Sequence, residues 1–311
     1  MSTNLTDPIF NNEDAARAHF ETIRWPDGRI CPHCGVVDNS HLMTGKSTRP
    51  GLYKCRDCRK PFSATIGTIY ERSHIPLHKW LLATHLMVSS KKGISSHQLF
   101  RMLGFGSYRT AWFMAHRIRE AMRDGDTGMF GGNGGVVEVD ETFIGRVKGA
   151  PVKRAFHHKM KVLALVDRET GRARTMVIDN VNATTLIPIV LANVERETRV
   201  MTDEHSGYFH IKTHFAAHGT TSHGRGEYVN LQDRSIHSNT VEGYFSIFKR
   251  GMRGVYQHCS EHYLHRYLAE FDFRYSNREA NGFNDTDRAK LAIAGVIGKR
   301  LMLQQPEGRA A

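Results

Sequence analysis

Four cysteines and three widely spaced carboxylates are the residues of this sequence whose types and spacing could support chemistry. The cysteines form two CxxC pairs, Cys31 with Cys34 and Cys55 with Cys58, and 20 residues separate the pairs. Each pair makes a tight turn whose sulfurs can occupy two corners of a tetrahedron, so the four thiolates complete a zinc shell. A complete shell leaves no open position, and we therefore predict a structural Zn²⁺ in a zinc ribbon. A redox dithiol is the alternative interpretation.

The carboxylates lie in segments of different periodicity. Asp140 lies in the alternating run VVEVDETFIG, Asp203 ends the strand-like run RVMTD, and Glu242 lies in the helical run HSNTVEGYFSIFKRG. Three carboxylates that converge in space could hold two Mg²⁺ ions about 3.5–4 Å apart, the arrangement used for phosphoryl transfer. We predict that Asp140, Asp203 and Glu242 are these ligands.

The helix that carries Glu242 has one apolar and one charged side. Its apolar stripe at i, i+3, i+4 and i+7 consists of Val241, Tyr244, Phe245 and Phe248. Glu242 and Lys249 project from nearly the same direction, and Arg250 and Arg253 follow. We predict that Lys249 contacts a DNA phosphate beside the metal site, with Arg250 and Arg253 as further DNA contacts. A ridge of solvated charge is the alternative interpretation.

The order of the elements favours a fold that could bring the three carboxylates together. Between residues 136 and 278 the patterns predict three strands, a helix, a fourth strand and a later helix. An antiparallel three-stranded meander extended by a parallel strand is the RNase H-like arrangement. Asp140 would then lie in mid-strand, Asp203 at the tip of a neighbouring strand, and Glu242 on a helix that covers the sheet. The expected fold class is α/β.

Positive charge is concentrated in one segment. Residues 41–124 hold 15 Lys or Arg against 4 Asp or Glu, a net charge of +11 in a chain whose total is +12. A polyanion such as double-stranded DNA is the expected partner. Residues 96–123 read as a helix, a Gly-containing turn and a longer basic helix, which is typical of a helix-turn-helix. Its candidate DNA-binding residues are Arg109, Arg117, Arg119 and Arg123. An ordinary helical hairpin is the alternative.

The remaining features set the organisation and the compartment. No apolar run is long enough to span a membrane and the N-terminus does not resemble a secretory signal, so we expect a cytoplasmic protein. The expected segments are an N-terminal helical segment (1–24), a zinc ribbon (25–69), a helix-turn-helix segment (70–124), a Gly-rich linker (125–135), an RNase H-like catalytic domain (136–278) and a C-terminal helical tail (279–311).

Five phrases together resemble the zinc-ribbon-bearing DDE group of bacterial insertion-sequence transposases, the ISXO-like branch. They are CPHCG…YKCRDCRKPFSATIGTI, GISSHQLFRMLG…TAWFMAHRIR, VEVDETFIG, VMTDEHSGY and HSNTVEGYFSIFKRGMRGVYQH. The resemblance implies Mg²⁺-dependent cleavage of DNA ends at terminal inverted repeats and joining of each 3′-OH to target DNA. It places Asp140, Asp203 and Lys249 on the family pattern. Because similar groups replace the third acid with Asn or His, Asn239 is held in reserve beside Glu242.

From these residues we expect a DNA transposase of the bacterial nucleoid that acts as a homodimer, with one active site for each transposon end. Two other functions fit parts of the sequence. A transcription regulator would use only the ribbon and the helix-turn-helix, and its DNA binding would not depend on Mg²⁺. A structure-selective nuclease of RNase H-like fold would nick DNA without joining it.

Overall fold

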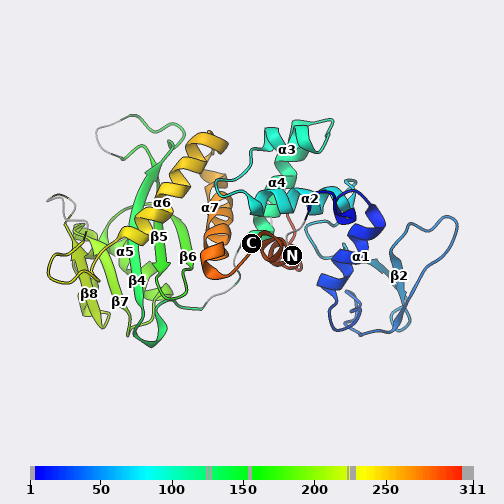
Figure 1. Ribbon diagram of the computed structural model, residues 1–311, viewed down its shortest axis with the longest axis horizontal. Coiled ribbons are helices and arrows are strands. Elements are labelled where there is room, and N and C mark those ends of the chain that lie inside the picture. Colours follow the sequence, from blue (N-terminus) through cyan, green and yellow to red (C-terminus); the bar gives the residue numbers. More distant parts are fainter. Residues whose placement is uncertain are drawn as a thin grey trace. The chain divides into compact units, whose positions relative to one another are not determined.

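The computed structural model describes residues 4–123, 125, 128–152, 156–222, 224 and 229–302. The chain divides into two compact units, whose ribbons are drawn in Figure 1. We call the first the ribbon unit; it consists of Met1–Ser90, Ile94–Arg123 and Phe283–Ala311. We call the second the sheet unit; it consists of Lys91–Gly93 and Asp124–Gly282. None of the helices in the described ranges is both long and apolar enough to cross a membrane.

The ribbon unit contains a small antiparallel sheet behind helix α1 (Glu13–Arg24). Its strands β1 (Ser40–Leu42), β2 (Leu52–Cys55) and β3 (Pro61–Ser63) pair in chain order. The aromatic core of this sheet consists of Trp25, Tyr53 and Phe62. The Trp25 ring meets the other two edge-on, at centroid distances of 6.0 and 6.1 Å. A core of this size stabilises little on its own, which is why such ribbons need a metal. The predicted zinc ribbon is confirmed.

The rest of the ribbon unit is helical and includes the predicted helix–turn–helix pair. Its helices are α2 (Leu77–Ser89), α3 (Ser96–Met102), α4 (Tyr108–Met122) and α8 (Asp285–Ala294). Ser95 caps α3 by accepting from the amide of Gln98, and Ser107 caps α4. Gly104 has a φ of +61° in the turn between them, a conformation that favours glycine. From the C-terminal tail, α8 packs against α1, α2 and α4.

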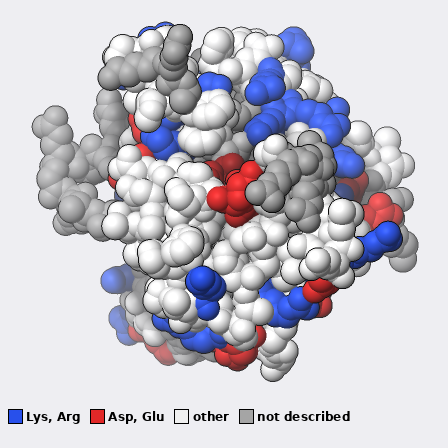
Figure 2. Space-filling model, turned by 90° about the vertical axis from the view of Figure 1, so that its left-hand side faces the viewer, with Lys and Arg blue, Asp and Glu red and all other residues white. Residues whose placement is uncertain are grey.

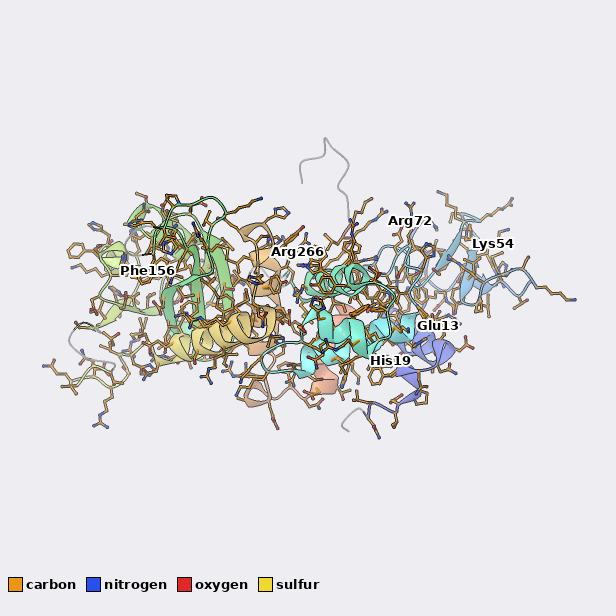
Figure 3. All side chains as sticks on the ribbon, turned by 90° about the horizontal axis from the view of Figure 1, so that it is seen from above. Glu13, His19, Lys54, Arg72, Phe156 and Arg266 are labelled. Carbon is orange, nitrogen blue, oxygen red and sulfur yellow. The ribbon has the colours of Figure 1, made fainter. Side chains whose placement is uncertain are left out.

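A carboxylate from α1 caps the start of α2. Pro76 precedes α2 and provides no side-chain cap. The Glu13 carboxylate instead accepts from the backbone amides of Leu77 and His78, at 2.9 and 3.2 Å. It also lies 2.9 Å from Nδ1 of His78. Figure 3 labels Glu13 at this junction. These contacts join the first two helices of the ribbon unit.

The sheet unit is built on a five-stranded mixed sheet. The strands are β4 (Val136–Ile144), β5 (Met160–Asp167), β6 (Ala173–Ile178), β7 (Arg199–Asp203) and β8 (Ala217–Thr221). Their spatial order is β6-β5-β4-β7-β8. Strands β4, β5 and β6 form an antiparallel meander, while β7 runs parallel to β4 and β8 parallel to β7. This order is that of the RNase H-like fold, so the expected α/β class is confirmed.

Helices cover both faces of this sheet (Figure 1). They are α5 (Ala183–Asn193), α6 (Asn239–Gly251), which continues into the π-helical turn Met252–Tyr256, and α7 (Glu261–Ser276). Helices α6 and α7 share an apolar core with Ile144 and Val162 of the sheet. On the other face, α5 packs with Val137 and Val139. Alternation along β4 therefore points Glu138 and Asp140 toward the α6 face, together with Ile144. Short 3₁₀ turns complete the chain at Pro8–Phe10, Gly132–Gly134, Ser206–Tyr208, Ile211–Thr213 and Glu279–Asn281.

The sequence did not predict strand β8. It lies within the histidine-rich stretch 205–229, and its residues AHGTT lack the apolar alternation of an ordinary strand. Pairing with β7 nevertheless extends from Arg199↔Ala217 to Asp203↔Thr221. Tertiary pairing overrides weak local preference here, as it commonly does in sheets. The pairing holds Asp203 between two neighbouring strands at the end of β7.

Candidate active site

The sheet brings Asp140 and Asp203 to adjacent positions. Strands β4 and β7 pair in parallel with Val136 opposite Arg199 and Glu138 opposite Met201. Two residues further along each strand lie Asp140 and Asp203. The Asp203 carboxylate accepts from the backbone amide of His205 at 3.0 Å, which orients it where the strand ends. The sequence placed both acids correctly on their strands.

Helix α6 adds Glu242 from above the same face. The predicted apolar stripe of this helix is buried, with Val241, Tyr244, Phe245 and Phe248 between 0% and 3% exposed. Glu242 lies in the first turn and accepts from the Ser238 hydroxyl at 3.1 Å. The reserve candidate Asn239 is exposed at the first residue of α6.

The electrostatics of Asp140 reflect the closeness of these acids. Burial raises the pKa of the Asp140 carboxyl to about 8. The nearby charges of Glu141, Asp203 and Glu242 raise it in the same direction. Mutual repulsion of this kind is found where carboxylates share a site for a cation. Figure 2 shows Asp and Glu side chains gathered at the centre of one face, with Lys and Arg beside them.

Lys249 belongs to the same cluster of charges. Burial lowers the pKa of its ammonium, while the charges of Asp140 and Glu242 raise it. The Lys249 ammonium lies 5.8 Å from the centroid of the Phe245 ring. It is thus held two turns beyond Glu242 and within electrostatic range of the acids. Arg253, in the π-helical turn, lowers the pKa of Lys249 and so lies close to it.

Glu141 points to the opposite sheet face and has partners there. The Tyr208 hydroxyl, in a side chain that is 1% exposed, donates to the Glu141 carboxylate. Burial raises the pKa of Glu141, and the hydrogen bond from Tyr208 opposes this shift. The ring of His205 approaches the same carboxylate at 3.8 Å. Alternation along β4 places Glu141 on this face, but nothing in the sequence indicates its partners.

The sulfur atoms of the four cysteines form a compact group in the ribbon unit. Sγ of Cys31 lies 3.7 Å from that of Cys58, and Cys34 and Cys55 are separated by the same distance. A tetrahedron with Zn–S bonds of about 2.3 Å has edges of about 3.8 Å. The donor set therefore fits zinc without rearrangement. Within the described part of the chain, it is the one group of three or more His, Cys, Asp or Glu residues whose ligand atoms all lie within 4.8 Å of one another.

The four candidate arginines in and directly after α4 differ in their exposure to solvent. Arg109 and Arg123 are exposed, whereas Arg117 and Arg119 are 8% and 0% exposed. Arg117 donates to the carbonyl of Glu71 at 3.1 Å and lies over the Trp80 ring. Both Arg117 and Arg119 are buried and so are not available to a DNA phosphate; the prediction that they contact DNA is wrong.

The sequence contained a signal for this burial. At helical spacing, Arg117 is flanked by Met114 and Ala121, and both are buried. Arg119 is flanked in the same way by Ala115 and Met122. Both arginines thus interrupt apolar stripes of α4 and follow them into the core, where their stems pack.

Known protein families match both parts of the chain. The family described as ISXO2-like transposase domain matches residues 133–276, which include all three carboxylates and Lys249. The family described as transposase zinc-ribbon domain matches residues 11–61, which include the four cysteines. The chain thus contains an ISXO2-like transposase domain and a transposase zinc-ribbon domain. The resemblance drawn from the motifs is thereby confirmed.

Two individual proteins are also similar to this chain. The "Uncharacterized protein in transposable element ISH50" of Halobacterium salinarum is 28% identical over 285 residues, which cover 85% of this chain and 91% of that protein. A solved chain of the simian T-cell lymphotropic virus intasome in complex with PP2A regulatory subunit B56 gamma is 14% identical. Its TM-score is 0.27, and the match covers 56% of this chain and 63% of that one.

Proposed function

We propose that the protein binds the terminal inverted repeats of an insertion sequence, cleaves the DNA ends and joins the freed 3′-OH ends to target DNA. The observation that carries the proposal is that Asp203 and Glu242 act electrostatically on Asp140 from a paired strand and a covering helix of an RNase H-like sheet, inside the region matched by the transposase family. Three carboxylates on separate elements supply hard oxygen donors and leave positions open for a phosphate and a nucleophile.

In the proposed site Asp140, Asp203 and Glu242 would hold two Mg²⁺ ions, which would supply Lewis-acid activation of the attacking oxygen and stabilisation of the leaving oxygen of the phosphodiester. Asp140 must lose its proton to bind a cation. Asp203 and Glu242 are fixed by the His205 amide and the Ser238 hydroxyl, so two of the three ligands are oriented before DNA arrives. Lys249 contacts the DNA backbone and offsets its negative charge beside the acids.

The other parts of the protein bind and position DNA. The four cysteines hold a structural Zn²⁺ that keeps the ribbon folded. Exposed Arg109 and Arg123 in the helix-turn-helix, together with Arg250 and Arg253 beyond Lys249, contact double-stranded DNA. Two transposon ends require two active sites, so we propose a homodimer on DNA. A location in the cytoplasm, at the nucleoid, follows from this substrate.

The test uses purified protein and duplex DNA that carries the sequence flanking its own gene. With Mg²⁺, the proposal predicts strand cleavage that leaves a 3′-OH and then products in which that end is joined to a second DNA. Asp203→Asn should bind the same DNA and yield neither product. Nicked but never joined DNA would indicate a nuclease. Tight binding without cleavage by the wild type would indicate a regulator.

A further inference from the structure

Arg168 lies outside the three carboxylates, yet it connects the strand of Asp140 to the helix of Glu242. It follows Asp167 in the turn between β5 and β6, and its backbone amide donates to the carbonyl of Val136 in β4. Its side chain is 17% exposed. Nothing in the sequence pattern distinguishes it from other arginines in hairpin turns.

Glu138 is the first part of this connection. It lies two residues before Asp140 on the same face of β4, and its side chain is 0% exposed. One carboxylate oxygen accepts from the backbone amide of Val241 at 2.8 Å. Val241 lies in the first turn of α6, directly before Glu242. A single buried carboxylate thus joins the strand of one candidate metal ligand to the residue next to another, and its charge suits a helix N-terminus.

Arg168 is the second part. Its Nε donates to the other oxygen of Glu138 at 2.6 Å. Its two remaining nitrogens donate to the backbone carbonyls of Ser235 and His237, each at 2.7 Å. One of these nitrogens also lies 2.9 Å from Nδ1 of His237. Apart from Glu138, every partner of the planar guanidinium among the described residues therefore belongs to the segment that leads into α6. A lysine ammonium cannot match this forked geometry.

We propose that Arg168 is a positioning residue for the third carboxylate of the active site. By joining Glu138 to the segment before α6, it fixes the start of the helix against β4 and so sets the separation of Glu242 from Asp140. The inference rests on the proposed function, in which Asp140 and Glu242 bind metal ions together. Such a site tolerates ligand displacements of only about 0.5 Å. Loss of such a supporting contact typically costs about 10- to 100-fold in metal affinity or activity.

The experiment compares Arg168→Gln and Arg168→Lys in the full-length protein with the wild type. The first measurement is the Mg²⁺ concentration that gives half-maximal DNA cleavage. We expect it to rise at least about 10-fold in Arg168→Lys, with DNA affinity unchanged. The second measurement is amide hydrogen exchange, which does not depend on catalytic activity. In Arg168→Lys, exchange in residues 238–244 should speed up at least about 10-fold, while exchange in α7 stays as in the wild type.

Arg174→Gln is the matched control. Arg174 of β6 donates to the Asn193 side chain and to the carbonyl of Gly128, and it lies over the ring of Phe130, which belongs to the core on the α5 face. This variant should retain both the Mg²⁺ dependence and the exchange rates of residues 238–244. Arg168→Lys keeps a positive charge beside the buried Glu138, so it covers the case in which Arg168→Gln does not fold.

The outcomes separate the inference from the proposed function. Unchanged Mg²⁺ dependence and exchange in Arg168→Lys would overturn the positioning role. Equal losses in Arg168→Lys and Arg174→Gln, in proportion to thermal stability, would also overturn it and leave only a structural role. If the wild type itself fails to cleave, the proposed function fails, and the exchange rates alone then decide whether Arg168 fixes α6.

Discussion

The sulfur atoms of the four cysteines in the ribbon unit lie within 4.8 Å of one another. The three carboxylates of the sheet unit do not form so close a group, although the charges of Asp203 and Glu242 raise the pKa of Asp140. The two sites differ in how they are assembled. Two local CxxC turns and one small sheet close the first. Two strands and a helix, more than 100 residues apart between Asp140 and Glu242, form the second. Four thiolates complete the ligand shell of a permanent structural metal. Three carboxylates leave coordination positions free, which suits metals that bind together with a substrate.

Breaking the closed site should have the largest effect. We expect Cys55→Ser to lose its zinc and unfold the ribbon, because metal binding supplies about 10–16 kcal/mol in comparable zinc peptides. The measurements are zinc content by mass spectrometry and limited proteolysis. The ribbon should become sensitive to protease between residues 30 and 63. Retention of one zinc per chain and of the protease pattern would contradict a four-cysteine site.

Breaking the open site should abolish activity and leave the fold intact. Asp140→Asn removes a charged oxygen ligand that adjoins both other acids, and we expect cleavage to fall at least about 1,000-fold, which corresponds to about 4 kcal/mol of transition-state stabilisation. The measurement is the single-turnover rate of end cleavage, with unchanged zinc content as the control. A variant within about 10-fold of wild type would exclude Asp140 as a metal ligand.

The same substitution should stabilise the metal-free protein. Between the ordinary pKa of Asp near 4 and the folded value of about 8, the folded state holds a proton that the unfolded state has lost. The stability of the wild type without metal should therefore fall as the pH rises through this window.

Because Asn cannot ionise, Asp140→Asn should lose this pH dependence. At pH 8 in chelator it should melt above the wild type, by about 2–4 °C for each kcal/mol of repulsion removed. Thermal melts at pH 5 and pH 8 provide the measurement. Equal wild-type melting curves at both pH values would contradict the raised pKa of Asp140. Mg²⁺ should raise the wild-type melting temperature more at pH 8 than at pH 5.

The smallest expected effects distinguish exposed from buried arginines on α4. Arg109→Ala should weaken DNA binding at all sequences and lower the slope of log affinity against log salt by about 1, with no change in melting temperature. Arg117→Ala should leave the salt slope unchanged and cost about 1–3 kcal/mol of stability, because its bond to the Glu71 carbonyl is lost in the core. The reverse result would return Arg117 to the DNA-binding surface.

How much the sequence predicts depends on how local each feature is. The CxxC spacing specifies the ribbon site, and the apolar stripe from Val241 to Phe248 specifies the buried face of α6. The arrangement of β4, β5, β6 and β7 followed from the predicted succession of three strands, a helix and a fourth strand. Strand β8 was not predicted because AHGTT has no apolar alternation. The contact between Glu138 and Arg168 was not predicted because the two residues are 30 positions apart in the sequence. Contacts of that kind depend on register and side-chain reach, which no local pattern encodes.

The most direct test of the account compares Glu242→Gln with Asn239→Ala in the assay with DNA flanking the gene. The account predicts that Glu242→Gln abolishes Mg²⁺-dependent cleavage and joining, because Glu242 acts on Asp140 electrostatically while Asn239 is exposed at the start of α6. Asn239→Ala should retain both activities. An inactive Asn239→Ala together with an active Glu242→Gln would contradict the three-carboxylate site.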